Sequence, residues 1–446
     1  MRHFFKAAAV VALSAGLVGC SSLNPFSDGG KAERDAAEKA QRVPLIALDA
    51  ELKADPNFAV ITIYLPEASS ADEWAQSGGS AGKVIGNRKG ADAFEIAWKK
   101  NVGEGSSRKQ RLIAPPIVSN DRIYVLDADQ KVHALDLKGS KVWSRALEKP
   151  RKLDKIGIGG GLAVSGDKLV VTSGYGYAVA LSTADGTELW KREAQAPITG
   201  APTISGGTIF TTSANNELYV LDLETGEARW SDQAIAESAR VLSAPSPAVS
   251  DDIVVAPFSS GEIIAYLPVN GRRLWSDSLT RGGQFTPISA INDIAGRPVI
   301  SEGMVYAASQ SGVVVGVDAI SGGRVWAKPF GSIQSPAVAG QFVFILNTNA
   351  QLVCMDKSTG GVIWVRQLRQ FEKEKKGKGR IVWTGPVIAS DRLVVANSRG
   401  EVMALDPQNG ETLDTVKVGD PVYIEPIVAH EHVYVLTDDA RLVAIR

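Results

Sequence analysis

The chain has 446 residues, and its 48 Lys and Arg nearly cancel its 49 Asp and Glu, which leaves a net charge of −1. This balance, without a basic stripe interleaved by aromatic residues, excludes a nucleic-acid-binding surface. The only cysteines are Cys20 and Cys354, so a framework of disulfide bonds is excluded as well.

The first segment, residues 1–19, is predicted to be a signal peptide. Basic residues precede an apolar run over 7–18 that is too short to span a bilayer. The sequence Leu17-Val18-Gly19-Cys20 resembles the lipobox of bacterial lipoproteins, which implies cleavage before Cys20 and acylation of that residue. Ser21 then implies sorting to the outer membrane. An ordinary secretory signal, or an uncleaved anchor, is the alternative.

Three further regions are predicted in chain order. Residues 20–57 are polar and charged, with a short Ala/Glu/Lys-rich piece over 31–42 that can be transiently helical, and we expect them to form a flexible tether. Residues 58–92 are predicted to be an N-terminal extension that packs on the main domain. Residues 93–446 form that domain.

Internal repetition dominates residues 93–446. In one copy Asp222 ends an apolar run, Thr225 and Gly226 form a turn, and Trp230 follows. Similar copies recur roughly every 38 to 51 residues, each preceded by two apolar segments, which is typical of propeller blades of four short strands. The repeated tryptophans are Trp98, Trp143, Trp190, Trp230, Trp275, Trp326 and Trp364. A further copy has Asp414 where Trp is expected.

Each motif position has a physical role. The turn glycine allows a positive φ, the Asp can accept hydrogen bonds from the turn's own amides, and the Trp can bury its ring against the next blade. Residues 441–446 look like a third strand without a fourth, and residues 94–98 look like a fourth strand without a third. Pairing them predicts an all-β, eight-bladed β-propeller of four-stranded antiparallel blades, closed by its two ends.

Other motifs are interpreted as structural. The glycines over 157–161 lack the Lys-Ser/Thr of a phosphate loop, and the sequence His430-Glu431-His432 falls where the repeat has a turn. No Ser/His/Asp arrangement can be argued from the few histidines. We therefore predict no catalytic residue, no metal site and no cofactor.

Three connections between a fourth strand and the next first strand are long, over 231–243, 276–296 and 366–382. In a four-stranded blade such connections share a rim with the turns between second and third strands. Long loops on one rim favour that rim for binding. The basic stretch over 372–380 is first interpreted as a solvated, flexible tip.

The repeat resembles that of pyrroloquinoline quinone dehydrogenases, which implies an eight-bladed ring. Enzymes of that kind carry adjacent, disulfide-linked cysteines beside the quinone and a calcium ion held by carboxylate and amide groups. This chain has no cysteine pair, because Cys20 is the predicted lipid site and Cys354 lies in an apolar strand. A periplasmic quinone-dependent dehydrogenase therefore stays only as an alternative, as does another envelope-assembly propeller.

With its lipobox, the region from Ala91 to Arg446 resembles the BamB family of propeller lipoproteins, and residues 69–79 resemble that family's longer N-terminal form. The resemblance implies a non-enzymatic scaffold on the periplasmic face of the outer membrane. The implied partners are the POTRA domains of BamA, other components of the β-barrel assembly (BAM) complex, and unfolded outer-membrane proteins. The membrane is contacted through the lipid anchor.

The resemblance also implies partner-binding residues. Arg240, ahead of Ser243-Ala244-Pro245, matches an arginine of the family, Leu242 lies beside it, and Asp293 matches an acidic position. The sequence departs from the family's pattern around Glu237 and at Ala295, where a second acidic residue is expected. An ordinary surface salt bridge is the alternative role for Arg240.

Overall fold

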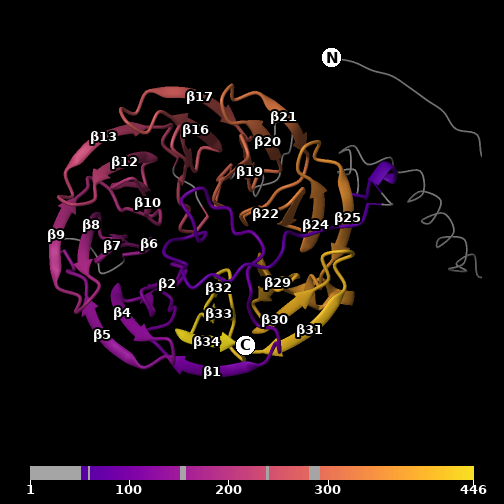
Figure 1. Cartoon of the computed structure of the whole chain (residues 1–446), viewed down its shortest axis with the longest axis horizontal. Coiled ribbons are helices and arrows are strands. Elements are labelled where there is room, and N and C mark those ends of the chain that lie inside the picture. Colours follow the sequence, from indigo (N-terminus) through magenta and orange to yellow (C-terminus); the bar gives the residue numbers. More distant parts are fainter. Residues whose placement is uncertain (1–51, 59–60, 151–156, 238–240, 281–291) are drawn as a thin grey trace, which may run out of the picture. The chain divides into compact units, whose positions relative to one another are not determined.

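The structure is a computed structural model that describes residues 52–58, 61–150, 157–237, 241–280 and 292–446. The predicted signal peptide, Cys20, most of the tether and Arg240 lie outside these residues. Leu52–Arg446 form one compact unit. Its blades are eight four-stranded antiparallel sheets arranged as a ring (Figure 1). The predicted all-β, eight-bladed propeller is confirmed.

In every blade the first strand lies toward the centre of the ring and the fourth strand lies at the perimeter (Figure 1). Blades 1 to 4 are formed by β2 (Ile117–Ser119), β3 (Arg122–Leu126), β4 (Lys131–Asp136) and β5 (Lys141–Ala146); β6 (Gly160–Ser165), β7 (Lys168–Ser173), β8 (Tyr177–Ser182) and β9 (Glu188–Glu193); β10 (Thr203–Ser205), β11 (Thr208–Thr212), β12 (Glu217–Asp222) and β13 (Ala228–Gln233); and β14 (Ala248–Val249), β15 (Val254–Pro257), β16 (Glu262–Tyr266) and β17 (Arg273–Ser278).

Blades 5 to 8 are formed by β18 (Val299–Ser301), β19 (Met304–Ala308), β20 (Val314–Asp318) and β21 (Arg324–Lys328); β22 (Ala337–Ala339), β23 (Phe342–Leu346), β24 (Gln351–Asp356) and β25 (Val362–Gln367); β28 (Trp383–Ala389), β29 (Arg392–Asn397), β30 (Glu401–Leu405) and β31 (Thr412–Lys417); and β32 (Ile427–Ala429), β33 (His432–Leu436), β34 (Arg441–Ile445) and β1 (Ile96–Asn101). Between blades 6 and 7 lie β26 (Phe371–Lys373), the 3-10 helix η2 (Glu374–Lys376) and β27 (Lys378–Arg380), and η1 (Pro56–Phe58) precedes the ring. No helix among the described residues is long and apolar enough to cross a bilayer.

The ring is closed by its first and last strands. β1 pairs antiparallel with β34, with Trp98 opposite Ala444, and Arg446 N donates to Glu95 O at 2.9 Å. The predicted closing strand over 94–98 begins later, at Ile96, because Phe94 adopts a positive φ of 50° in a turn. The predicted pairing of the chain ends is confirmed, and it leaves blade 8 with four strands.

Tryptophans of the fourth strands join successive blades. Trp190 Nε1 donates to Leu223 O of the next blade at 3.0 Å, and a Cβ added to Gly226 would lie 2.5 Å from the Trp190 ring. The turn glycine is therefore needed for two reasons, its φ of 71° and the indole that covers it. The same indole-to-carbonyl hydrogen bond is made by Trp143, Trp230, Trp275, Trp326 and Trp364.

The junction of blades 7 and 8 differs. Asp414 stands in the tryptophan position, opposite Ala404. In the other blades an indole covers the turn between the third and fourth strands of the next blade. Blade 8 has no such turn, because its third strand, β34, ends the chain and its fourth strand, β1, begins the ring. Instead Arg392 lies over the Phe94 ring at 5.7 Å and donates to Ala91 O at 3.0 Å. The repeat thus loses its tryptophan at the one junction where the next blade has no turn for the indole to cover.

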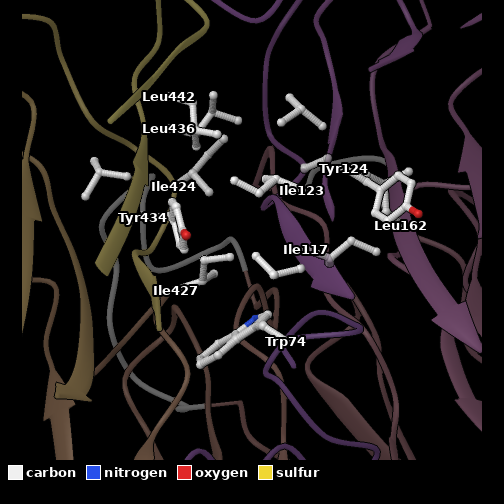
Figure 2. Packing of buried hydrophobic residues seen from close by; sticks show 14 of the residues in the cluster. Trp74, Ile117, Ile123, Tyr124, Leu162, Ile424, Ile427, Tyr434, Leu436 and Leu442 are labelled. Atoms are coloured by element: carbon white, nitrogen blue, oxygen red, sulfur yellow. The ribbon is translucent and has the colours of Figure 1, made fainter. Parts of the chain in front are cut away.

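Residues 61–92 cross the centre of the ring (Figure 1). Their backbone bonds to first strands on several sides: Trp74 pairs with Val118, and Val249 N donates to Ala81 O at 2.9 Å. Trp74 is fully buried, and Figure 2 shows its indole next to Ile117 and Ile427. These contacts run along the first strands, so the extension fills the centre of the ring between the blades.

Candidate functional site

The rim that carries the connections between fourth and first strands is called the long-loop rim here. The connection over 366–382 packs there, since Gln370 Nε2 donates at 2.6 Å to Asn349 O, in the turn between the second and third strands of blade 6. Leu242 of the connection before blade 4 lines one cavity together with Asn216 and Ser259, in the corresponding turns of blades 3 and 4. Both loops therefore lie on the rim that the sequence favoured for binding.

Two adjoining cavities open at the mouth of the central channel on this rim. One has a volume of about 210 Å³ and is lined by Ile113, Leu242 and Asp293, among others. The second, of about 130 Å³, shares Ile113 and Leu242 and extends to Arg297 and Tyr423. The structure thus brings together two of the three predicted partner-binding residues, while Arg240 lies outside the described residues.

Leu242 and Asp293 have different environments. The Leu242 side chain is 57% exposed, whereas Asp293 is only 4% exposed. Asp293 Oδ2 accepts a hydrogen bond from Val241 N at 2.6 Å, so its carboxylate fixes the backbone that presents Leu242. A charge-assisted hydrogen bond to a backbone amide is stronger than a neutral one. Asp293 thus acts here as a positioning residue behind an exposed apolar side chain.

A buried polar network forms the floor of the second cavity. Arg297 Nη2 pairs with Glu425 Oε1, and Arg297 Nη1 donates to Ser77 Oγ of the extension at 3.2 Å. Lys83 Nζ donates to Ser77 O at 2.9 Å. Burial, followed by the nearby Arg297, lowers the pKa of the Lys83 ammonium well below its usual value, while Glu425 opposes that shift. The network links the extension to blades 5 and 8.

The His133 side chain has a structural role, because its ring is hydrogen-bonded to Asp127. Its Nε2 lies 2.8 Å from Asp127 Oδ2, and Asp127 also accepts hydrogen bonds from Glu104 N and Lys131 N. The pair therefore fixes a turn of blade 1 and the strand connection that enters it.

The ring lacks the cysteine pair that the resemblance to quinone dehydrogenases implies beside a bound quinone. Cys354 is fully buried in β24, where burial raises the pKa of its thiol, and the ring has no second cysteine to pair with it. Within the described ranges, no group of three or more His, Cys, Asp or Glu could hold a metal ion.

Sequence reasoning missed the residues around Leu242, including Ile113, Arg297, Tyr423 and Glu425. A signal was present: a proline stands directly before most first strands, as Pro116, Pro202, Pro247, Pro298, Pro336 and Pro426. Proline restricts the residue before it to extended conformations. The residues just ahead of several of these prolines line the channel mouth.

Comparisons with known proteins agree on the fold. A family model described as outer membrane protein assembly factor BamB matches residues 128–366 and 367–446. The assembly factor BamB of Moranella endobia is 22% identical over 340 residues, which are 74% of this chain and 84% of the relative.

Two solved structures share the architecture. The crystal structure of BamB from Moraxella catarrhalis has a TM-score of 0.65 at 19% identity and covers 78% of this chain and 99% of its own. A europium-containing methanol dehydrogenase has a TM-score of 0.66 at 14% identity and covers 82% of this chain and 89% of its own. Likeness at such identities shows the fold alone.

Proposed function

Because the chain belongs to the family of outer membrane protein assembly factor BamB, we propose that it is a non-catalytic scaffold of the outer-membrane β-barrel assembly (BAM) machinery. Its long-loop rim binds the POTRA domains of BamA, and the bound ring assists insertion of outer-membrane proteins. Other components of the complex, and unfolded outer-membrane proteins, are further partners of the proposal.

One observation carries the proposal: a large apolar side chain is held exposed at the mouth of the channel. Leu242 is 57% exposed, and the bond from Val241 N to the buried Asp293 fixes its loop. Tyr423, 47% exposed, lies across the second cavity. Exposed apolar residues around a preformed hollow are typical anchors of protein interfaces.

The test compares two leucines of similar exposure. Leu242→Ala should weaken binding to purified BamA POTRA domains by about 10-fold or more, as truncation of an interface anchor does. Leu413→Ala is the matched control, because Leu413 is 50% exposed on the perimeter strand β31. Equal affinities for the two variants in titration calorimetry would contradict the proposed rim.

The non-catalytic role has its own test. Pyrroloquinoline quinone and calcium are added to the purified chain, and the absorption spectrum and reduction of an artificial electron-accepting dye are followed. We expect no bound chromophore and no dye reduction with alcohols. A retained chromophore together with dye reduction would contradict the non-catalytic role and support a dehydrogenase.

We also propose that acyl chains on Cys20 hold the protein on the periplasmic face of the outer membrane. Each buried methylene adds about 0.8 kcal/mol of membrane affinity, so several chains anchor a protein without a transmembrane helix. Replacing residues 1–20 with a cleavable secretory signal that ends without a cysteine should abolish labelling by radioactive palmitate and move the protein to the soluble periplasmic fraction. An unchanged membrane fraction would contradict the anchor.

A further inference from the structure

The connection between blades 6 and 7 carries a concentrated positive charge. Residues 371–380 hold five basic and two acidic side chains, a net charge of +3, in a chain whose net charge is −1. Residues 372–380 are all exposed. The segment lies on the long-loop rim, where the proposed function places a partner.

The segment is a paired hairpin whose base is hydrogen-bonded to the ring; the solvated tip expected from its composition is exposed, and its predicted flexibility stays a prediction. β26 and β27 pair through Phe371 and Arg380 and through Lys373 and Lys378. Arg369 Nη2 donates to Glu372 O at 2.7 Å, and Trp383 Nε1 donates to Arg369 O at 2.8 Å. These contacts hold the base of the hairpin on the long-loop rim and so fix where its lysines are presented.

The lysines of the hairpin repel one another. Lys373 and Lys378 stand directly opposite across the strand pair, and like charges in that position are destabilising. Among the described residues, no carboxylate lies within 4 Å of the ammonium groups of Lys373, Lys375, Lys376 or Lys378. The Glu372 carboxylate instead faces the neighbouring blade, where its Oε1 lies 3.9 Å from Arg399 Nη1 in the turn between β29 and β30. The hairpin thus keeps a repulsion that an external anionic group would relieve.

The charge pattern favours a protein surface over a bilayer. Residues 372–380 include no apolar side chain that could insert between lipids, and Phe371 is half-buried at the base. Glu372 and Glu374 alternate with lysines, so a uniformly negative surface would repel them, whereas a protein can present carboxylates at discrete places.

We propose that the β26–β27 hairpin is a second docking element, which binds a carboxylate-rich protein surface on the partner that the long-loop rim engages. The proposal rests on the proposed partner-binding function of that rim. The hairpin supplies charge complementarity, and the channel mouth supplies the apolar anchor.

The test measures binding to the purified POTRA domains at low and high salt. Two triple Lys→Gln variants remove equal charge, one from the hairpin and one from exposed sites elsewhere: K375Q/K376Q/K378Q and K89Q/K138Q/K141Q. The hairpin variant should bind roughly 10-fold more weakly at low salt, and the control should stay within about 2-fold of wild type. The difference should vanish near 0.5 M NaCl because salt screens exposed charges. Equal binding of the two variants at low salt would overturn the proposal.

A second measurement separates this proposal from the proposed function. A photo-crosslinking residue replaces Lys376 in cells, with Ile320, 86% exposed in the opposite-rim turn that follows β20, as the control position. Adducts from position 376 alone that map to an acidic protein surface support the hairpin, even if the wild-type chain does not bind POTRA domains. Adducts with lipid only, or no adducts, overturn it.

Discussion

The glycine in each turn between a third and a fourth strand can be tested by adding one methyl group. Gly226→Ala places a Cβ 2.5 Å from the Trp190 ring at a φ of 71°. The left-handed backbone costs about 1 to 2 kcal/mol for a residue with a Cβ, and overpacking against the half-buried indole adds roughly 1 to 3 kcal/mol. Gly226→Ala should therefore lower the free energy of unfolding by about 2 to 5 kcal/mol.

Gly206→Ala is the matched control in the same blade. Gly206 has a φ of 55°, and no atom lies within 4 Å of its added Cβ, so only the backbone cost of about 1 to 2 kcal/mol applies. Urea unfolding followed by tryptophan fluorescence measures both variants, and repeating Gly226→Ala in a Trp190→Ala background should remove the overpacking cost. Equal destabilisation by the two substitutions would refute the role of the indole.

Three other perturbations test the channel and the closure. Lys83→Met should raise the free energy of unfolding of the ring. This gain should shrink as pH rises from 7 toward 10.5, the ordinary pKa of lysine. The reason is that the unfolded chain keeps the Lys83 proton to higher pH than the folded ring does, so the stability of the wild type itself rises over that range. A gain that is constant in thermal unfolding from pH 7 to 10 would contradict this. Asp293→Ala should weaken POTRA binding by about 1 kcal/mol, because the hydrogen bond from Val241 N is lost. Asp293→Asn keeps a hydrogen-bond acceptor and should bind nearly as well as wild type. Weaker binding of Asp293→Asn than of Asp293→Ala in calorimetry would exclude the positioning role. Deletion of 441–446 leaves β1 unpaired and should abolish cooperative unfolding measured by circular dichroism, and a retained single transition would show that closure is dispensable.

The ring could be predicted because its signals are local and repeated. A turn glycine followed by a tryptophan, as at Gly226 and Trp230, marks one strand pair; six such copies mark six blades, and Gly410 with Asp414 marks a seventh. The closure followed from two incomplete blades, one at each end of the domain. Only the start of β1 was misplaced, because Phe94 looks like a strand residue but adopts the left-handed conformation of a turn.

The channel floor could not be predicted in the same way. Ser77, Lys83, Arg297 and Glu425 come from segments far apart in the chain, and only the ring brings them together. A lysine within a polar extension looks solvated in the sequence, and its burial depends on the extension crossing the channel. Asp293 was noticed as a charge, but its bond to Val241 N is a tertiary contact that no pattern encodes.

The pairing of β1 with β34 also sets an order of events during synthesis. The ribosome makes β1 before every other strand of the ring, and it makes the partner of that strand last. Until then both edges stay open to wrong pairing, and closure must wait for a contact between the most distant parts of the domain, which is a slow kind of step. The ring can therefore close only once its last strand is available.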